Sequence, residues 1–231
     1  MTISRRGMLA ATVIGIPLGA PALLALRPAQ AQTSAQTPAQ PPAQPAAPAP
    51  APAAPDPRMA ERGAGKAGAP VTVMEYFSLT CPHCARFHNE VWPKVKSDLV
   101  EPGKARMVWR DFPLDQLALA AACAARALPV DRYEGFVSAL FANQDRWAFA
   151  RGIDNLGEVA KIAALAGMSR ADFDAAVNDR NLQRAIMEMR QQGENEFSVN
   201  STPTFVFNGK SVPGEIPFER FAELVKQATP G

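Results

Sequence analysis

Residues 75–84 read Glu75-Tyr-Phe-Ser-Leu-Thr-Cys-Pro-His-Cys84, and they join two kinds of local structure. They complete the run Val71–Phe77, which is rich in β-branched and aromatic residues and follows Gly68 and Pro70. Such a run predicts a strand that is buried on both faces. Pro82 suits the first turn of a helix, where its missing N–H is no loss. The stretch therefore predicts a buried strand, a short loop and a helix that begins beside two cysteines.

The segments on the C-terminal side extend this pattern. Apolar residues recur at four-residue spacing from Phe87 to Leu99, which predicts that the helix continues. Pro93 should kink it, because a proline in a helix removes one backbone hydrogen bond. Residues 105–112 are typical of a second strand, which Pro113 ends.

Residues 115–195 change character, with apolar residues at helical spacing throughout, and predict an all-helical block. Strands return at 204–207 and 210–212 around Asn208-Gly209, a pair that favours a tight hairpin because both residues tolerate positive φ. A last helix is expected over about 217–227. The order strand, helix, strand, helical block, hairpin and helix predicts an α/β fold with an inserted all-helical subdomain.

The chemistry of the chain is concentrated at Cys81-Pro82-His83-Cys84. The first thiol lies where the unpaired backbone N–H groups and the dipole of a helix start favour a thiolate. The thiolate is the form that attacks a disulfide, and a stabilised thiolate makes the oxidised pair a stronger oxidant. We therefore expect Cys81 to form a mixed disulfide with a substrate protein and Cys84 to resolve it. His83 is expected to add to the stabilisation of the Cys81 thiolate.

The cysteine pair has three other possible uses. A zinc site needs four ligands, for which the chain offers only Cys81, Cys84, Cys123 and one of its two histidines. Covalent haem attachment needs a histidine directly after the second cysteine, where Ala85 stands. We therefore expect no metal or haem here. An inert structural disulfide remains open, although two-residue loops at helix starts are uncommon as structural staples.

The stretch from Glu75 to Cys84 resembles the active-site segment of the DsbA family of thioredoxin-fold oxidases, in which Cys-Pro-His-Cys is the usual tetrapeptide. The helical insertion matches that family, as does the later segment Ser-Thr-Pro-Thr-Phe-Val-Phe-Asn-Gly at 201–209. The resemblance covers about residues 70–228. It implies a thioredoxin-like fold and dithiol/disulfide exchange through Cys81 and Cys84 without a dissolved cofactor. It also implies reoxidation by a membrane quinone-linked partner.

Thr202-Pro203 is the second functional element. An X–Pro bond in a folded protein is usually trans, but the resemblance implies that Pro203 is cis and packs beside the active-site sulfurs. The backbone before it would then pair with an extended substrate peptide. The best-known oxidases of the family carry Val before this Pro, whereas disulfide isomerases often carry Thr. Thr202 therefore leaves the choice between oxidase and isomerase open.

Three further residues carry expectations. Glu75 lies six residues before Cys81 and is either an exposed residue at the sheet end or, as the resemblance implies, a buried acid that assists proton transfer. Burial would raise its pKa, and Lys104 is a candidate partner. We interpret Cys123, in an Ala-rich stretch, as a buried small residue. His88 is interpreted as a solvated helix residue.

Residues 1–31 are typical of an export signal. Arg5-Arg6 precede an uncharged apolar stretch from Met8 to Leu26, and Ala29 and Ala31 form an A-x-A cleavage signal. The paired arginines resemble a twin-arginine signal, with an ordinary secretory signal as the alternative. A retained membrane anchor is a third alternative, which the prolines and glycines within the stretch disfavour. Export places the mature chain in an oxidising compartment.

Residues 32–57 consist almost entirely of Ala, Pro, Gln, Thr and Ser, a composition that buries too little surface to fold. We expect a disordered Pro/Ala-rich tether over 32–69 and the thioredoxin-like domain over 70–231. The chain has 24 Lys and Arg against 22 Asp and Glu, without a basic run. This balance makes nucleic acid a poor partner.

Together these features predict a periplasmic thiol-disulfide oxidoreductase that introduces disulfide bonds into unfolded or reduced exported proteins. No stable membrane insertion is expected after signal cleavage. An isomerase or reductase is the first alternative, supported by Thr202 and weakened because a Pro/Ala tether stands where a dimerisation domain would lie. A tethered chaperone or binding module with a structural disulfide is the second. That alternative predicts substrate binding that survives the substitution Cys81→Ser.

Overall fold

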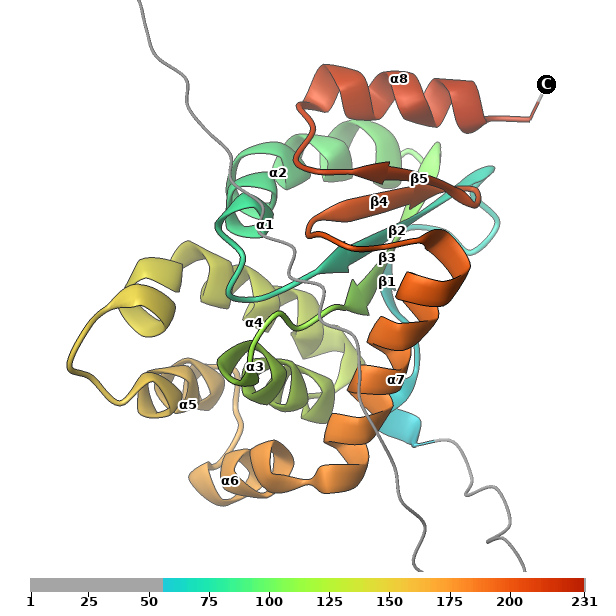
Figure 1. Ribbon diagram of the computed structural model, residues 1–231. Helices are drawn as coiled ribbons and strands as arrows, with labels where there is room; N and C mark the ends of the chain where they lie inside the picture. Colours follow the sequence, from blue (N-terminus) through green and yellow to red (C-terminus); the bar gives the residue numbers. More distant parts are fainter. Residues whose placement is uncertain (1–55, 231) are drawn as a thin grey trace, which may run out of the picture. The chain divides into compact units, whose positions relative to one another are not determined.

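The computed structural model describes residues 56–230 (Figure 1). The expected export signal and residues 32–55 of the expected tether lie outside the described residues. The strands are β1 Arg62–Ala64, β2 Val71–Phe77, β3 Ala105–Asp111, β4 Thr204–Phe207 and β5 Lys210–Pro213. The helices are η1 Pro57–Met59, α1 Pro82–Arg86, η2 Phe87–Val91, α2 Trp92–Val95, η3 Lys96–Val100, α3 Gln116–Ala127, α4 Val130–Ala142, η4 Asp145–Phe149, α5 Asn155–Leu165, α6 Arg170–Asn178, α7 Arg180–Phe197 and α8 Phe218–Ala228.

A five-stranded mixed sheet forms the centre of the domain, in the order β1-β3-β2-β4-β5. β2 and β3 are parallel, as expected for two strands joined by a helical crossover. β1, β4 and β5 pair antiparallel with their neighbours. β2 lies in the middle and is buried at most positions, which confirms the interpretation of its apolar run.

The two faces of β2 pack against different layers. Val73 and Phe77 belong to the large core, together with residues of α1, α2 and α8, whereas Tyr76 belongs to a smaller core on the other face. In Figure 1, α2 and α8 lie on one side of the sheet and α7 on the other. Glu75 alternates with Tyr76 and therefore points into the same layer as Val73 and Phe77. This alternation directs an acidic side chain toward the helical run that carries the cysteines.

β1 corrects the expected start of the folded domain. It lies within the expected tether, yet it pairs with β3 and forms one edge of the sheet. The Arg62 side chain is buried and donates hydrogen bonds to the carbonyl oxygens of Arg126 and Leu128, at 3.1 and 3.3 Å. The folded domain therefore begins before residue 70. A three-residue edge strand leaves no apolar pattern for sequence analysis to detect, because backbone pairing and one arginine hold it.

The helix that begins at Pro82 continues to Val100, as expected, but two of its segments are not α-helical. The segments η2 and η3 are π-helical, and Pro93 is the second residue of α2, the α-helical turn between them. A proline cannot donate its backbone hydrogen bond, so the regular α-helical pattern is interrupted beside it. The apolar positions Phe87, Val95 and Leu99 still face the core.

The expected helical insertion is confirmed between β3 and β4, where α3 to α7 follow one another. α7 returns the chain to the sheet and packs against β3 (Figure 1). Gly193 in α7 lies against the ring of Tyr76, and a β-carbon there would overlap the ring. The absence of a side chain at this position is what lets α7 approach the sheet so closely.

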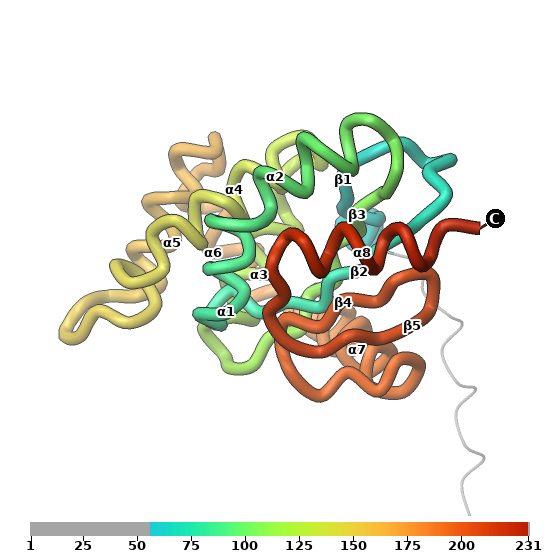
Figure 2. The backbone as a smooth tube through the Cα atoms, turned by 90° about the horizontal axis from the view of Figure 1, so that it is seen from above, coloured from blue at the N-terminus to red at the C-terminus, as the bar shows by residue number. Residues whose placement is uncertain are grey.

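The C-terminal hairpin and helix are confirmed as well. β4 and β5 are joined through Asn208 and Gly209, which both have positive φ, at 43° and 90°. α8 lies over the sheet beside α2 (Figure 2). Its Phe221 ring packs on Phe205 and Phe207 with centroid distances of 5.7 and 5.1 Å. Within residues 56–230, no helix has the length and apolarity needed to cross a bilayer.

Candidate active site

The two cysteines occupy the start of α1, just beyond the end of β2. Cys81 is the residue that precedes the first helical turn, and Pro82 takes the first helical position, as predicted. The Cys81 N–H donates to the Ser78 carbonyl oxygen at 3.1 Å, which closes the loop after the strand. Among residues 56–230, no side chain caps the start of this helix. The backbone N–H groups of the first turn are therefore available to the Cys81 sulfur.

The Cys81 thiol is unusually acidic. Its pKa is lowered from an ordinary 9.0 to about 5, chiefly because the Cys84 thiol donates a hydrogen bond to its sulfur. Burial opposes this shift, while the Thr202 side chain and the backbone N–H groups of Cys84 and His83 add to it. Cys81 is therefore mostly thiolate at neutral pH, the form that performs exchange.

Cys84 has the opposite character. Burial, the neighbouring Cys81 sulfur and the charge of Glu75 raise the pKa of Cys84 well above its ordinary value. Cys81 keeps 5% of its surface exposed, whereas Cys84 has 0%. Of the two sulfurs, Cys81 is thus the one that a substrate can reach, and Cys84 stays protonated until an internal step needs it.

Thr202 and Pro203 lie beside the reactive sulfur, although they are far from it in the sequence. The Thr202-Pro203 bond is cis, as the family resemblance implied. The Thr202 carbonyl oxygen lies 3.3 Å from the Cys81 sulfur and accepts a hydrogen bond from it in the thiol form. Apart from its effect on the Cys81 sulfur, the buried Thr202 hydroxyl has no hydrogen-bond partner within the described residues. The loop before β4 therefore forms one wall of the site.

Sequence reasoning missed Gln144, which follows α4. Its side chain is buried and its amide nitrogen donates to the carbonyl oxygens of Leu79 and Cys81, at 2.7 and 3.1 Å. These bonds tie the helical insertion to the active-site loop. An amide near the end of an apolar helix carries no sequence signal for this role, because its partners are backbone atoms more than 60 residues away.

Glu75 is fully buried, which agrees with the buried-acid interpretation rather than with an exposed residue. His88 corrects our expectation, since it is not solvated but buried beside Glu75. Its ring nitrogen Nε2 lies 3.0 Å from the Glu75 oxygen Oε2. Lys104, the expected partner of Glu75, instead donates to the Asp98 carbonyl oxygen at 3.1 Å. The π-helical turn that carries His88 places its ring over the sheet, which a regular helix wheel does not anticipate.

The His83 side chain lies at the mouth of the site and is half-exposed. Its Nδ1 atom lies 3.0 Å from the Glu215 oxygen Oε2, and Arg86 donates to the same oxygen at 3.0 Å. The structure therefore directs the ring of His83 to Glu215, while its backbone N–H acts on the Cys81 sulfur. Glu215, in the loop between β5 and α8, is a second site residue that sequence analysis missed.

An open groove of about 610 Å³ adjoins the Cys81 end of the site. One wall comes from the helical run of α1 and η2, and the other from the loops that flank the C-terminal hairpin. The lining residues are His83, Glu90, Val91, Ser201, Thr202, Gly214, Glu215, Ile216 and Pro217. A groove with a polar rim, beside the only partly exposed sulfur of the pair, is suited to an extended peptide.

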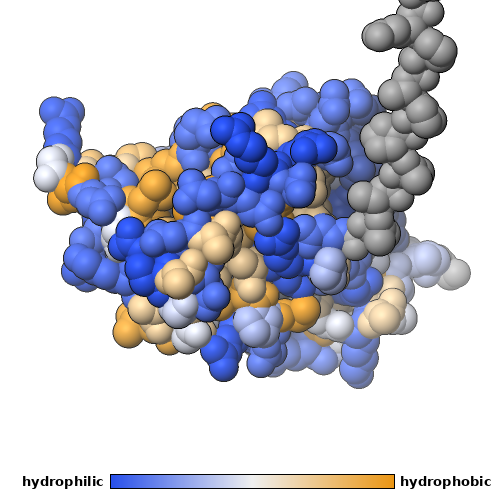
Figure 3. Space-filling view, turned by 90° about the horizontal axis from the view of Figure 1, so that it is seen from below, coloured by the Kyte–Doolittle hydropathy of each residue, from blue (hydrophilic) through white to orange (hydrophobic). Residues whose placement is uncertain are grey.

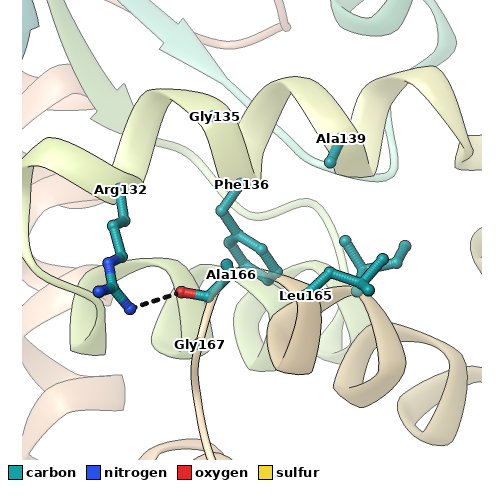
Figure 4. Close-up of a pocket in the computed structure, with 8 residues that line it drawn as sticks. Arg132, Gly135, Phe136, Ala139, Leu165, Ala166 and Gly167 are labelled. Atoms are coloured by element: carbon teal, nitrogen blue, oxygen red, sulfur yellow. Dashed lines mark hydrogen bonds between the residues drawn. The ribbon is translucent and has the colours of Figure 1, made fainter.

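A second cavity lies away from the cysteines, between α4 and α5 (Figure 4). Phe136, Ala139 and Leu165 point into it, and Arg132 closes one end by donating to the Ala166 carbonyl oxygen at 3.0 Å. None of the predicted site residues lines it. The underside of the molecule shows apolar side chains exposed among polar ones (Figure 3).

Cys123 is buried in α3, as predicted from its Ala-rich surroundings. Burial, with smaller contributions from the charges of Asp111 and Asp179, raises its pKa to about 12. Cys123 therefore stays protonated and unreactive at neutral pH. Among residues 56–230, no group of three or more His, Cys, Asp and Glu side chains is arranged to hold a metal ion.

Known proteins resemble this chain over most of the described part. A protein-family model described as thioredoxin matches residues 59–227. A Rickettsia felis relative, provisionally named a protein-disulfide oxidoreductase, is 28% identical over 146 residues, which are 63% of this chain and 52% of that protein. The Yersinia pestis thiol:disulfide interchange protein DsbA is 28% identical over 142 residues, or 60% of this chain and 66% of that protein. The chain thus spans about half the length of the Rickettsia relatives that it matches.

Solved structures show the same fold. Wolbachia pipientis α-DsbA1 superimposes with a TM-score of 0.68 at 27% identity, covering 76% of this chain and 92% of that one. Bacillus subtilis BdbD, at 18% identity, shares the fold with a TM-score of 0.65 over 74% of this chain and 94% of that one. The family model spans the sheet, the helical insertion and both parts of the cysteine site. On these grounds, the chain belongs to the DsbA family of thioredoxin-fold proteins.

Proposed function

We propose that this chain is an exported thiol-disulfide oxidoreductase that introduces disulfide bonds into reduced or unfolded exported proteins. The names of its relatives support disulfide oxidoreductase chemistry as the general class. The observation that carries the proposal is the contrast between the two sulfurs. An acidic, partly exposed Cys81 lies beside a fully buried Cys84 with a raised pKa.

This contrast favours oxidation of the substrate. A thiolate that is stabilised in the reduced protein makes the reduced state more stable, so the disulfide becomes a stronger electron acceptor. In the oxidised protein, a substrate thiolate attacks the Cys81 sulfur, the Cys81–Cys84 bond breaks and Cys84 leaves with an electron pair and takes up a proton. The second thiolate of the substrate then attacks the substrate sulfur of the mixed disulfide, which releases Cys81 as a thiolate. The protein has accepted two electrons and the substrate has gained one disulfide.

The remaining site residues have supporting roles in this proposal. Pro82 and the backbone of His83 shape the helix start that holds the Cys81 thiolate, and Glu75 assists proton transfer at Cys84. Thr202 and Pro203 present backbone to an extended peptide in the adjoining groove. Backbone pairing of this kind makes little demand on substrate sequence. A broad set of exported proteins is therefore the proposed substrate class.

The proposed location is the periplasm, reached through the signal at residues 1–31, with reoxidation by a membrane quinone-linked partner. The exchange itself uses only the two cysteines and needs no dissolved cofactor. An oxidising compartment suits this reaction, because it lacks the reductants that keep cysteine pairs as thiols in the cytosol.

The test uses the chain without its signal, oxidised and mixed with a reduced two-cysteine peptide. We expect one peptide disulfide to form for each Cys81–Cys84 disulfide that becomes reduced. The Cys81→Ser variant should not oxidise the peptide. Cys123→Ser is the matched control, because Cys123 is buried and protonated, and it should oxidise the peptide as the unmodified chain does. Equal oxidation by Cys81→Ser and the unmodified chain would refute the proposal.

A disulfide isomerase is the second candidate, and Thr202 is the observation that favours it. The Thr202 side chain and carbonyl oxygen both lie at the Cys81 sulfur, where they influence the stability of the thiolate. The two candidates differ in reduction potential and in substrate. An oxidase oxidises reduced peptide and has a potential above the glutathione couple. An isomerase restores activity to a scrambled disulfide protein from the reduced state of the pair, and that assay separates the two.

A further inference from the structure

Glu75 and His88 form a buried pair directly behind the cysteine site. The Glu75 oxygen Oε2 lies 3.0 Å from the His88 nitrogen Nε2, and the two side chains are 0% and 2% exposed. The other polar atom of each side chain, Glu75 Oε1 and His88 Nδ1, is buried and has no hydrogen-bond partner among residues 56–230. Unsatisfied buried atoms of this kind are rare in proteins and call for an explanation, one of which is a catalytic or redox role.

The surroundings of this pair are aromatic. The ring centroid of His88 lies 4.5 Å from that of Phe141, 5.8 Å from Phe87 and 5.9 Å from Phe77. An isolated charge in such a place is unfavourable by several kcal/mol, because it loses its water. A carboxyl and an imidazole that share one proton are neutral together. The 3.0 Å separation is short enough for the two side chains to share one proton between them.

Two titratable groups on neighbouring helices respond to the charge of Glu75. One is Cys84 on α1, whose pKa is raised chiefly by burial and in part by Glu75. The other is Tyr133 on α4, whose pKa burial and Asp111 raise well above its ordinary value, so that it stays neutral. Of these two, only Cys84 changes its charge during disulfide exchange. The nearest use for the shared proton is therefore at the Cys84 sulfur.

We propose that His88 is a positioning residue for Glu75 and that the two side chains act as one proton-holding unit for Cys84. The inference rests on the proposed function for its biological purpose. When a thiolate attacks Cys81, the Cys81–Cys84 bond breaks and Cys84 leaves as a buried thiolate. The shared proton moves to the Cys84 sulfur, which leaves Glu75 as a carboxylate hydrogen-bonded to neutral His88. Reoxidation returns that proton to the pair as Cys84 attacks the mixed disulfide.

The test measures the reduction of the oxidised chain by dithiothreitol between pH 5 and 9. The variants are Glu75→Gln, His88→Gln and the double variant. Glutamine at 88 can still donate a hydrogen bond to Glu75 but cannot carry the shared proton. We expect each single variant to be slower by about a hundredfold at neutral pH, the lower end of the range for a lost proton donor. The double variant should be no slower than either single one, because residues that act as a unit are non-additive.

The matched control is Phe141→Leu, which loosens the packing on His88 without removing a titratable group. It should keep the pH profile of the unmodified chain. Reduction of His88→Gln within twofold of the unmodified chain, or a double variant whose loss is the product of the single losses, would overturn the proposal. Dithiothreitol is a small dithiol, so this test can fail while peptide oxidation by the chain still holds, and the reverse is equally visible.

A second measurement does not depend on the exchange activity of any variant. Nitrogen NMR of the labelled imidazole reports the protonation of His88 in the oxidised and the reduced chain. We expect the protonation of His88 to differ between the two redox states at the same pH, and Glu75→Gln to abolish the difference. An imidazole with the same protonation in both states from pH 5 to 9 would show that the pair is only structural.

Discussion

The Cys81 sulfur lies 3.3 Å from the carbonyl oxygen of Thr202, a residue 121 positions further along the chain. The whole helical insertion stands between the two in sequence, yet β4 returns the chain to the side of β2. This pairing places Thr202 and Pro203 at the loop that carries the cysteines. The reactive sulfur is therefore held between the start of α1 and the start of β4, and its acidity depends on both.

Cys84 is the main source of the acidity of Cys81. Cys84→Ala removes the hydrogen-bond donor with the largest effect, so we expect the pKa of Cys81 to rise from about 5 toward its ordinary 9.0. Cys84→Ser keeps a donating hydroxyl and should hold the pKa near that of the unmodified chain. The thiolate absorbance or the pH dependence of alkylation measures both. If alanine and serine at position 84 give the same titration, the hydrogen bond is not the cause.

The stability of the reduced chain should depend on pH in a defined window. The pKa of Cys81 is lower in the folded than in the unfolded chain, so the thiolate stabilises the folded state above pH 5. This contribution should grow by about 1.4 kcal/mol per pH unit up to about pH 9, and vanish as the pH falls through 5. Above pH 9 the raised pKa of Cys84 works against folding. Urea unfolding of the reduced chain at several pH values measures the slope.

The disulfide form is the internal control for this dependence, because neither cysteine titrates in it. The difference between the unfolding free energies of the reduced and the oxidised chain should therefore increase with pH at the slope given above. A difference that stays constant from pH 5 to 8 would contradict the assigned acidity of Cys81.

Gln144 holds the active-site loop against the helical insertion. Gln144→Leu leaves the buried carbonyl oxygen of Leu79 without this donor and weakens the hold on Cys81, so we expect a loss of about 1–3 kcal/mol in the free energy of unfolding. The rate of Cys81 alkylation should change with it, because the loop no longer fixes the sulfur. Urea unfolding and alkylation at pH 7 measure these effects.

The matched control for this variant is Asn143→Ala. The Asn143 side-chain amide donates to the Ala139 carbonyl oxygen of the preceding helix, at 2.9 Å, and to no other atom of the part of the chain that the structure describes. The Asn143→Ala variant should therefore have nearly the same Cys81 alkylation rate as the unmodified chain. The same alkylation rate for Gln144→Leu and Asn143→Ala would argue against a role for Gln144 at the site.

Arg126 and Asp111 form a buried ion pair that joins α3 to β3. The Arg126 nitrogen Nε lies 2.5 Å from the Asp111 oxygen Oδ2, and the two side chains are 0% and 2% exposed. Arg126→Leu leaves a buried carboxylate without its partner, for which we expect a loss of about 3–5 kcal/mol. Replacing both residues by leucine should lower the free energy of unfolding by less than replacing Arg126 alone, because no unpaired charge is then left buried. Urea unfolding of the single and double variants tests this order.

Local patterns predicted the elements well. The strand at 71–77, the helix that begins at Pro82, the helical insertion and the Asn208-Gly209 hairpin are each defined by spacing or by a residue with a restricted backbone, and each is confirmed. The edge strand β1 was missed because a short edge strand has no apolar alternation. His88 was misassigned because the π-helical turn η2 alters which face the residue occupies.

The sequence by itself predicted which sulfur is reactive, because Cys81 stands just before a proline at a helix start and its main hydrogen-bond donor, Cys84, is only three residues away. Only the tertiary structure decided what surrounds that sulfur. Gln144, Thr202, Glu215 and the Glu75–His88 pair reach the site through folding, and their partners lie on other elements or on the opposite layer of the core. Periodicity encodes which face of an element is buried, but not which polar group on one buried face will meet another. Contacts of that kind depend on how the sheet and the helical insertion pack. This packing therefore determines which hydrogen bonds and charges surround the Cys81 sulfur.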